Sequence, residues 1–181
     1  MKNHVSNVLI VLCLLVGATH WGEQPIGAWA LSQEVQIEKI EVKSSPNGPV
    51  VLLKVGDRAI PIFVDPIVAR SIQGALSGEK FSRPLSHELM SSILRSYDIR
   101  VQQVFVTLRQ GVYYGTLSLL HNGKVQVFDS RSSDAIGLAV HFHSPVYVEQ
   151  SLLDSAGIQW DQEDFEGKRR EINFIDVRSQ M

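Results

Sequence analysis

Apolar and polar residues alternate along much of this chain, a pattern that predicts β-strands. The first alternating segment has one break, because Ile37 and Ile40 differ in parity, so we expect a bulge or a twist there. Between two later segments, Asn122-Gly123 is a strong hairpin signal, since this pair readily supplies positive φ at both turn positions. The expected strands cover residues 34–43, 50–55, 59–64, 99–108, 112–120, 125–128 and 145–148.

Other segments have the period of amphipathic helices. Asp65-Pro66 suits a helix start, because aspartate caps and proline has no N–H to leave unpaired. Further helices are expected from Ser86, from a cap at Ser132 or Ser133, and over residues 150–156. The side chains expected to face the core are Ile67, Val68, Ile72, Ala75 and Leu76 in the first helix, Leu89, Ile93 and Leu94 in the second, and Ala135, Ile136, Leu138, Ala139 and Val140 in the third.

Strands joined by hairpins, with helices inserted between them, predict an α+β fold with a mainly antiparallel sheet rather than a doubly wound parallel one. The length of 181 residues fits one domain with appendages. Lys and Arg number 17 against 19 Asp and Glu, so no global charge attracts nucleic acid or an anionic membrane. The expected parts are a signal peptide at 1–30, a folded domain at 31–157 and a charged tail at 158–181.

The first 30 residues have the organisation of an export signal. Lys2 and His4 give a short basic start, an apolar run follows over residues 8–16, and Ala28-Trp29-Ala30 has the small-x-small pattern of a signal peptidase site. The run is shorter than the ~20 residues that span a bilayer. We therefore expect an exported protein, periplasmic or secreted, with no membrane segment after cleavage. Cleavage after Ala18 is a second option, and an uncleaved anchor or a buried helix is the alternative reading of the run.

The single cysteine of the chain, Cys13, lies within this apolar run. Removal of the signal leaves no thiol, which excludes disulfides, thiolate metal sites and cysteine nucleophiles from the mature chain. Any chemistry then rests on carboxylates, histidine and arginine.

A first polar cluster lies at the expected start of the second helix. Pro84 disfavours helix at the preceding residue, which places Arg83 in an extended entry segment. His87 and Glu88 fall in the first helical turn, where a negative Glu88 complements the helix dipole. The same residues also fit an ordinary capped helix start with a partly buried, hydrogen-bonded histidine.

A second polar cluster lies where the strand at 125–128 leads into the third helix. A strand-to-helix turn presents backbone N–H groups and the positive end of a helix dipole, which suits an anion such as phosphate. Capping of the third helix, together with an ion pair between Arg131 and Asp129, explains part of this cluster. Capping alone, however, requires only one or two polar residues. The polar residues of this cluster are Asp129, Ser130, Arg131, Ser132, Ser133 and Asp134.

The two clusters together offer groups for phosphodiester chemistry. Carboxylates suit Mg²⁺ or Mn²⁺, which stabilise in-line attack on phosphorus. In this hypothesis His87 is a general base or a ligand. We expect His87, Glu88, Asp129 and Asp134 to be catalytic, Asp129 and Asp134 to hold the metal ion, and Arg83, Arg131, Ser132 and Ser133 to bind the substrate.

Four segments in this order resemble the bifunctional nuclease domain family: residues 60–64, 83–89, 129–139 and 145–148. The resemblance covers roughly residues 50–157. It implies a roll-like α+β fold, homo-oligomerisation, and nuclease activity on DNA and RNA, an activity attributed to some plant members. The export signal departs from the family, whose members usually look intracellular.

The leading hypothesis is therefore metal-assisted hydrolysis of DNA or RNA. The alternative is a non-catalytic binding or assembly module of the same fold, because the chain lacks a basic patch and capping accounts for many of the same residues.

Overall fold

The computed structural model describes residues 33–159, which form four helices and nine strands. The expected signal peptide and all but two residues of the expected tail lie outside this range. The helices are α1 (Pro66–Ser77), α2 (Ser86–Ser96), α3 (Ser132–Phe142) and α4 (Gln150–Ala156). The strands are β1 (Glu34–Gln36), β2 (Lys39–Ser45), β3 (Gly48–Val55), β4 (Arg58–Phe63), β5 (Arg100–Arg109), β6 (Val112–His121), β7 (Lys124–Arg131), β8 (Val146–Glu149) and β9 (Ile158–Gln159).

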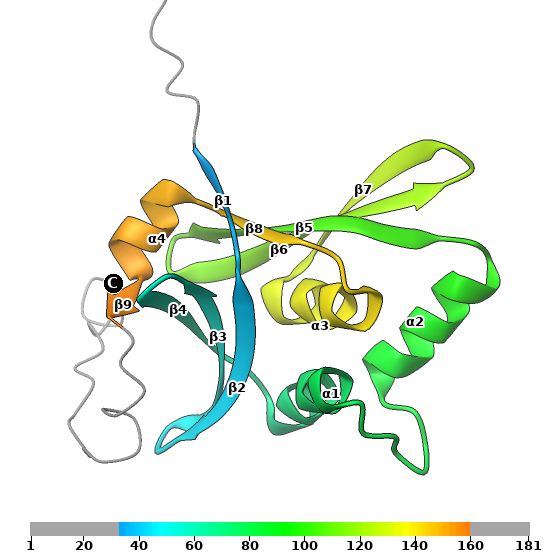
Figure 1. The fold of residues 1–181 in the computed structure, drawn as a ribbon, viewed down its shortest axis with the longest axis horizontal. Helices are drawn as coiled ribbons and strands as arrows, with labels where there is room; N and C mark the ends of the chain where they lie inside the picture. The colour runs from blue at the N-terminus through cyan, green and yellow to red at the C-terminus, as the bar shows by residue number, and fades with distance from the viewer. Residues whose placement is uncertain (1–32, 160–181) are drawn as a thin grey trace, which may run out of the picture. The chain divides into compact units, whose positions relative to one another are not determined.

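The strands form two sheets (Figure 1). The five-stranded sheet has the order β1-β8-β5-β6-β7, and the four-stranded sheet has the order β2-β3-β4-β9. Neighbouring strands are antiparallel except for β5 and β8, which pair in parallel. The predicted α+β fold with a mainly antiparallel arrangement is confirmed.

The first predicted strand is divided in the structure, and its halves enter different sheets. Glu34–Gln36 pairs with β8, whereas Lys39–Ser45 pairs with β3. Ile37, at the break, is 7% exposed and belongs to the core. The break in parity therefore marks a crossing between sheets rather than a bulge within one strand.

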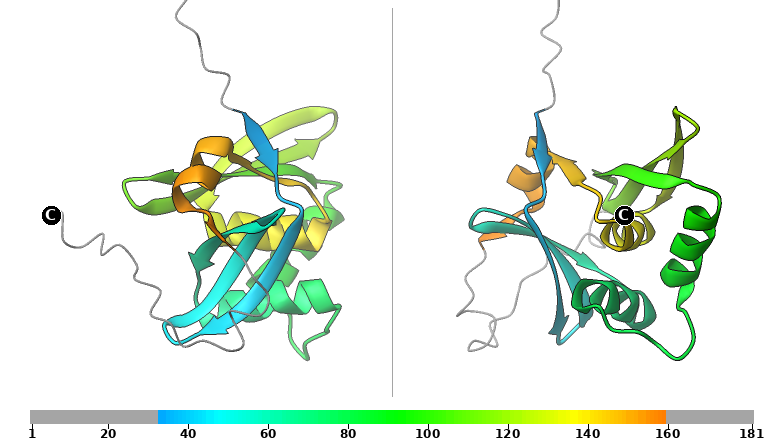
Figure 2. Two further views of the ribbon diagram at one scale, coloured as in Figure 1. Left: turned by 60° about the vertical axis from the view of Figure 1, so that its left-hand side comes forward. Right: turned by 45° about the vertical axis from the view of Figure 1, so that its right-hand side comes forward.

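Helix α3 packs against one side of the five-stranded sheet and also against α1 (Figures 1 and 2). All five of its predicted core residues are buried. The β6–β7 hairpin turns at Asn122-Gly123 with positive φ at both residues, as predicted. Strand β7 continues beyond the predicted residue 128 to Arg131, and α3 follows at once with Arg131 as its N-cap residue in place of the predicted serine.

The buried faces of the first two helices differ from the prediction. In α1, Ile67 and Leu76 are exposed, while Ser71 is buried beside Ile72. In α2 the inward side chains are His87 and Ser91, with Leu94 partly buried, whereas Leu89 and Ile93 are about half exposed. Hydrophobic periodicity gave the wrong orientation for α2, because His87 bonds to the two neighbouring helices and Ser91 satisfies its hydroxyl on the carbonyl oxygen of Glu88 within α2.

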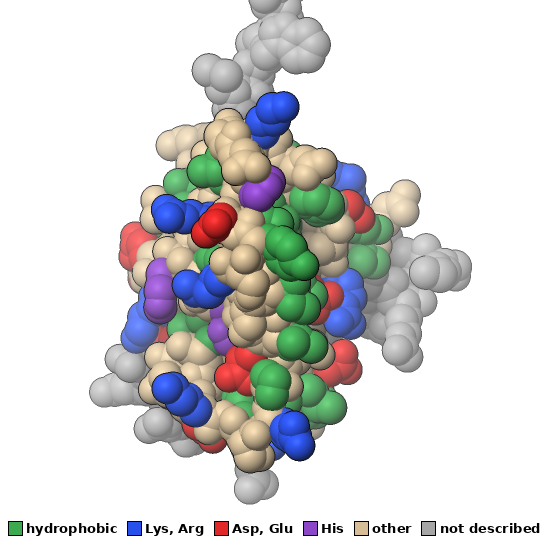
Figure 3. Space-filling view, turned by 90° about the vertical axis from the view of Figure 1, so that its right-hand side faces the viewer, with side chains coloured by type: hydrophobic (Ala, Val, Ile, Leu, Met, Phe, Trp, Pro, Cys, Tyr) green, Lys and Arg blue, Asp and Glu red, His purple; other side chains and the backbone are tan. Residues whose placement is uncertain are grey.

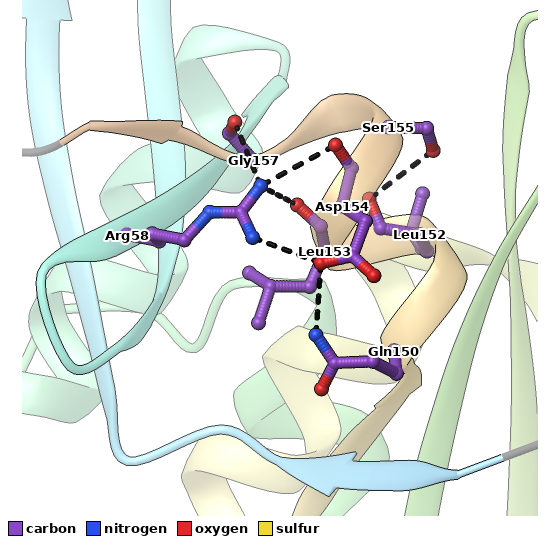
Figure 4. Close-up of polar contacts among 7 residues, drawn as sticks. All are labelled: Arg58, Gln150, Leu152, Leu153, Asp154, Ser155 and Gly157. Atoms are coloured by element: carbon purple, nitrogen blue, oxygen red, sulfur yellow. Dashed lines mark hydrogen bonds and ion pairs between the residues drawn. The ribbon is translucent and has the colours of Figure 1, made fainter.

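Helix α4 is fastened to the four-stranded sheet by Arg58 of β4 (Figure 4). Nη1 of Arg58 lies 2.9 Å from Asp154 Oδ1, and Nη2 of Arg58 donates to the carbonyl oxygen of Leu153 at 2.6 Å. These contacts fix α4 beside β4. Within residues 33–159, no helix has both the length and the apolar character needed to cross a membrane.

Candidate functional site

A buried histidine connects three helices at the centre of the candidate site. His87 of α2 is 3% exposed, its Nδ1 lies 3.1 Å from Ser71 Oγ of α1, and its Nε2 lies 3.1 Å from Asp134 Oδ1 of α3. An ionised carboxylate only accepts hydrogen bonds, so Nε2 carries the hydrogen and donates to Asp134. The first and second clusters of the sequence therefore meet through His87 and Asp134.

The local sequence explains how His87 reaches this position. The Glu88 side chain accepts a 2.9 Å hydrogen bond from the Leu85 N–H, which satisfies one of the unpaired donors at the start of α2. Opposite the histidine, Gly137 of α3 leaves room for the imidazole. A Cβ atom there would lie 2.8 Å from both Cε1 and Nδ1 of His87.

Asp134 extends the connection to Arg131 at the surface. Arg131 Nε donates to Asp134 Oδ2 at 2.7 Å, and Nη2 donates to Oδ1 at 3.1 Å. The Asp134 side chain is 28% exposed and that of Arg131 is 66% exposed, while Asp65 Oδ2 lies 3.8 Å from Nη1. Ser71, His87, Asp134 and Arg131 thus form a continuous chain of contacts, here called the Ser71–Arg131 network, that runs from the core to solvent.

Charge within the network keeps Asp134 ionised. Burial favours the neutral carboxyl, but hydrogen bonds from Arg131 and His87 outweigh it and hold the pKa of Asp134 below its ordinary value. The hydrogen bonds that Arg131 donates to Asp134 also raise the pKa of Arg131. Asp134 is consequently a poor proton acceptor at neutral pH, and its role in the network is to hold Arg131.

His141, one turn after Gly137 on α3, lies near the network. Its ring centroid is 6.5 Å from that of His87, and its buried Nε2 has no hydrogen-bond partner among the described residues. Burial, followed by the charge of His87, lowers the pKa of His141. A neutral His141 therefore borders the buried side of the network.

The remaining predicted site residues lie outside this network. Arg83 is exposed in the loop between α1 and α2, and Asp129 is exposed on β7, opposite Thr116. Ser132 is buried in the first turn of α3, and neither Ser132 nor Ser133 supplies a side-chain cap. Of the predicted site residues, the Ser71–Arg131 network contains His87, Asp134 and Arg131 within the described chain. Glu88 instead caps the N-terminus of α2.

Sequence reasoning missed Ser71 and Gly137. A signal for Ser71 is present, because this polar residue lies next to Ile72 on a helix whose other inward residues are apolar or small. The contact between Gly137 and His87 had no such signal, because it joins residues 50 positions apart on two helices.

Among residues 33–159, no three His, Cys, Asp or Glu side chains converge as a metal-ligand group. Both carboxylate oxygens of Asp134 accept hydrogen bonds from cationic or imidazole donors, so this residue fits a metal ligand poorly in the arrangement seen. Asp129 is exposed and suits a cation that is also bound by substrate phosphate, the usual way in which Mg²⁺ is held. The sequence-based metal hypothesis thus rests on Asp129 alone.

Hydrophobic side chains form a band on the face that displays α2 (Figure 3). This band, here called the α2 stripe, occupies successive turns of the helix and consists of Leu89, Met90, Ile93 and Tyr97, which are 41% to 67% exposed. On β7, Val125, Val127 and Phe128 are also exposed. Single exposed hydrophobic residues are common, but a contiguous set at helical spacing is typical of an interaction surface.

Comparison with known proteins identifies relatives of this domain. Residues 50–161 match the family model described as the bifunctional nuclease domain. An uncharacterized protein of Mycobacterium tuberculosis strain H37Rv is 33% identical over 128 residues, which are 69% of this chain and 76% of that protein. Bifunctional nuclease 2 of Oryza sativa subsp. japonica and bifunctional nuclease 1 of Arabidopsis thaliana are each 28% identical, over 65% and 61% of this chain but only 38% and 36% of their own lengths.

Proposed function

Because this chain belongs to the bifunctional nuclease domain family, we propose that it hydrolyses phosphodiester bonds of DNA or RNA at the surface end of the Ser71–Arg131 network. The observation that supports this site is the exposed Arg131 guanidinium, which two hydrogen bonds to Asp134 hold in one orientation. A fixed guanidinium is well suited to bind phosphate and to stabilise charge that develops on it.

The residues divide into contact and positioning roles. Arg131 binds a substrate phosphate through the edge of its guanidinium that Asp134 does not occupy, and Asp129 lies two residues away on the same strand. Asp134 and His87 are positioning residues, because both nitrogens of His87 are engaged within the protein and the imidazole is buried. His87 in this arrangement reaches the substrate only through Asp134, rather than as a direct base.

A divalent cation, Mg²⁺ or Mn²⁺, would supply Lewis-acid stabilisation of the phosphate, with Asp129 as its protein ligand. The protein part of the site then consists of one carboxylate that holds the cation and one arginine that orients the phosphate. Export to the periplasm or the medium remains a prediction and would place this activity on extracellular nucleic acid.

The activity is tested by incubating the purified chain with DNA and RNA oligonucleotides in Mg²⁺, in Mn²⁺ and with chelator. We expect metal-dependent cleavage of at least one substrate, and we expect Asp129→Asn to lower the rate by about 100-fold. Asp57→Asn, on the turn before β4, is the control and should cleave as well as the parent. Absence of cleavage under all conditions would contradict the proposed function, and equal activity of Asp129→Asn would contradict the assigned metal ligand.

We also propose that the chain assembles with copies of itself through the α2 stripe. The support is that α2 buries polar residues and exposes apolar ones, an arrangement that is favourable when a partner covers the apolar side. Such an assembly is compatible with nuclease activity. It is also compatible with the alternative function, a non-catalytic binding or assembly module.

Light scattering coupled to size-exclusion chromatography tests the assembly. The parent should have a mass above that of a single chain, and Ile93→Glu should reduce it to that of a single chain, because a buried unpaired carboxylate opposes association. Gln73→Glu adds the same charge at an exposed position of α1 and should leave the mass unchanged. A parent of single-chain mass, or an Ile93→Glu variant with the parental mass, would overturn this surface assignment.

A further inference from the structure

The five-stranded sheet has one side covered by α3 and another side that no described helix crosses (Figures 1 and 2). Register separates the two sides, since directly paired residues point to the same side. The core residues Val104, Val106 and Leu117 face α3. Their neighbours along β5, β6 and β8 therefore face the opposite side, here called the open face.

Three aromatic residues from three adjacent strands share the open face. Phe105 of β5 is in register with Tyr147 of β8 and with Thr116 of β6. Tyr114 of β6 is in register with Thr107, one diagonal step from Phe105. Adjacent strands lie about 4.8 Å apart, so these rings are neighbours. All three are partly exposed, and none belongs to the buried core.

Cationic groups accompany the aromatic ones. The guanidinium carbon of Arg109 lies 5.5 Å from the centre of the Tyr114 ring, in a cation–π arrangement. Arg100 is exposed at the opposite end of β5, and Arg131 of the proposed catalytic site is in register with Tyr114. Acidic residues lie at the margins, with Glu149 on β8 and Asp129 on β7. Arginines thus lie at both ends of β5 with the aromatic residues between them, an arrangement complementary to a polyanion with flat rings.

A cavity of about 460 Å³ opens at the end of this face, between β5 and α4. Its polar lining consists of Thr107, Arg109, Glu149, Ser151 and Ser155, and the Ser151 hydroxyl donates to Glu149. The buried Oγ1 of Thr107 has no hydrogen-bond partner within the described chain. A cavity of this size holds a small polar ligand, and hydroxyls beside an arginine suit the sugar and phosphate of one nucleotide.

We propose that the open face binds single-stranded nucleic acid, with bases stacked on Phe105, Tyr114 and Tyr147 and the backbone passing from Arg109 toward Arg131. This inference rests on the proposed function only for the class of polymer, because binding requires no cleavage. Stacking on exposed rings favours a single strand, since the bases of a duplex are already stacked inside it. Hydroxyls and arginines among the rings favour nucleic acid over an apolar protein partner.

Fluorescence anisotropy with labelled 12-nucleotide single-stranded DNA and RNA, in chelator, tests this binding without cleavage. Tyr114→Ala and Tyr147→Ala should each weaken binding about fivefold or more, as expected for the loss of one base–aromatic stack. Tyr147→Phe keeps the ring and should bind like the parent. Phe63→Ala, an aromatic 40% exposed on the other sheet, is the matched control and should also bind like the parent.

The outcomes separate this inference from the proposed function. Parental binding by both tyrosine-to-alanine variants, equal weakening by Phe63→Ala, or tighter binding of the same oligonucleotide as a duplex would overturn the open-face assignment, whatever the cleavage assay shows. A reduced oligomer mass in Tyr114→Ala would overturn it in favour of a protein contact. Binding that depends on the rings in a chain that never cleaves would support the open face while contradicting the nuclease proposal.

Discussion

Replacement of Gly137 by alanine is expected to destabilise the fold by about 2–3 kcal/mol. The new Cβ would lie 2.8 Å from two ring atoms of His87, which is 3% exposed and hydrogen-bonded at both nitrogens. Overpacking of this kind costs about 1–3 kcal/mol. Displacement of the imidazole also weakens hydrogen bonds worth about 1 kcal/mol each, while alanine returns about 1 kcal/mol of helix propensity. Urea unfolding of the variant and the parent measures the difference.

A double-mutant cycle shows whether the imidazole causes this loss. In a His87→Ala background the obstacle is gone, so Gly137→Ala should be neutral or should stabilise α3 by up to about 1 kcal/mol. A similar destabilisation in both backgrounds would contradict the explanation and point to a backbone requirement at Gly137. The cycle remains informative although each single variant is less stable than the parent, because it compares the effect of Gly137→Ala on the free energy of unfolding with and without His87.

Local signals in the sequence were sufficient for most of the elements. Asp65-Pro66 starts α1 and Asn122-Gly123 turns the β6–β7 hairpin, because each dipeptide has backbone preferences that act without distant partners. The split of the first strand between two sheets was not predictable in this way. Its cause is the burial of Ile37 in a core built from both sheets, which is a long-range packing effect.

Long-range contacts also determine the features of the candidate site that could not be predicted from the sequence. The sequence identified His87 and Asp134 by residue type, but their meeting depends on α2 and α3 packing together. Strand β7 extends to Arg131 because it pairs with β6 as far as Tyr114, so residues read as a polar turn are in fact the end of a strand. Periodicity also could not reveal that α2 turns His87 inward, because the partners of this histidine lie on α1 and α3.

The two proposed surfaces are connected through Arg131. Its backbone pairs with Tyr114 of the open face, while its side chain bonds to Asp134 at the start of α3. A strand of nucleic acid that follows the open face therefore ends at the residue proposed to hold the scissile phosphate. This continuity makes the orientation of Arg131 the feature on which both binding and cleavage depend.

Replacement of Asp134 by asparagine is expected to lower the cleavage rate by about 100-fold, because misplacement of a substrate-holding group by about 1 Å can have an effect of that size. Asparagine keeps the shape but replaces one of the two acceptor oxygens by an NH₂ donor, so it cannot accept all three hydrogen bonds that Asp134 accepts from Arg131 and His87. Breaking a hydrogen bond to a charged group should also cost about 1–3 kcal/mol of stability. Initial rates on oligonucleotide and urea unfolding at neutral pH measure the two effects.

The pH dependence distinguishes this residue from a titrating base. The pKa of Asp134 in the fold lies below its ordinary value of 3.8, so the stability that its ionised form contributes is complete above that value and is lost as pH falls through the lowered pKa. In the parent, stability should therefore decline at acid pH more steeply than in Asp134→Asn. The cleavage rate near neutral pH should show no change that reflects ionisation of Asp134.

Two further variants test whether Asp134 acts by positioning Arg131. Arg131→Lys keeps the charge and loses the paired hydrogen bonds, so it should lower cleavage to a similar extent, and the double variant Arg131→Lys with Asp134→Asn should be no worse than either alone. Asp154→Asn removes a carboxylate from the Arg58 ion pair on α4 and should cleave like the parent. Additive losses in the double variant would show that Asp134 acts independently of Arg131, and would overturn the positioning role.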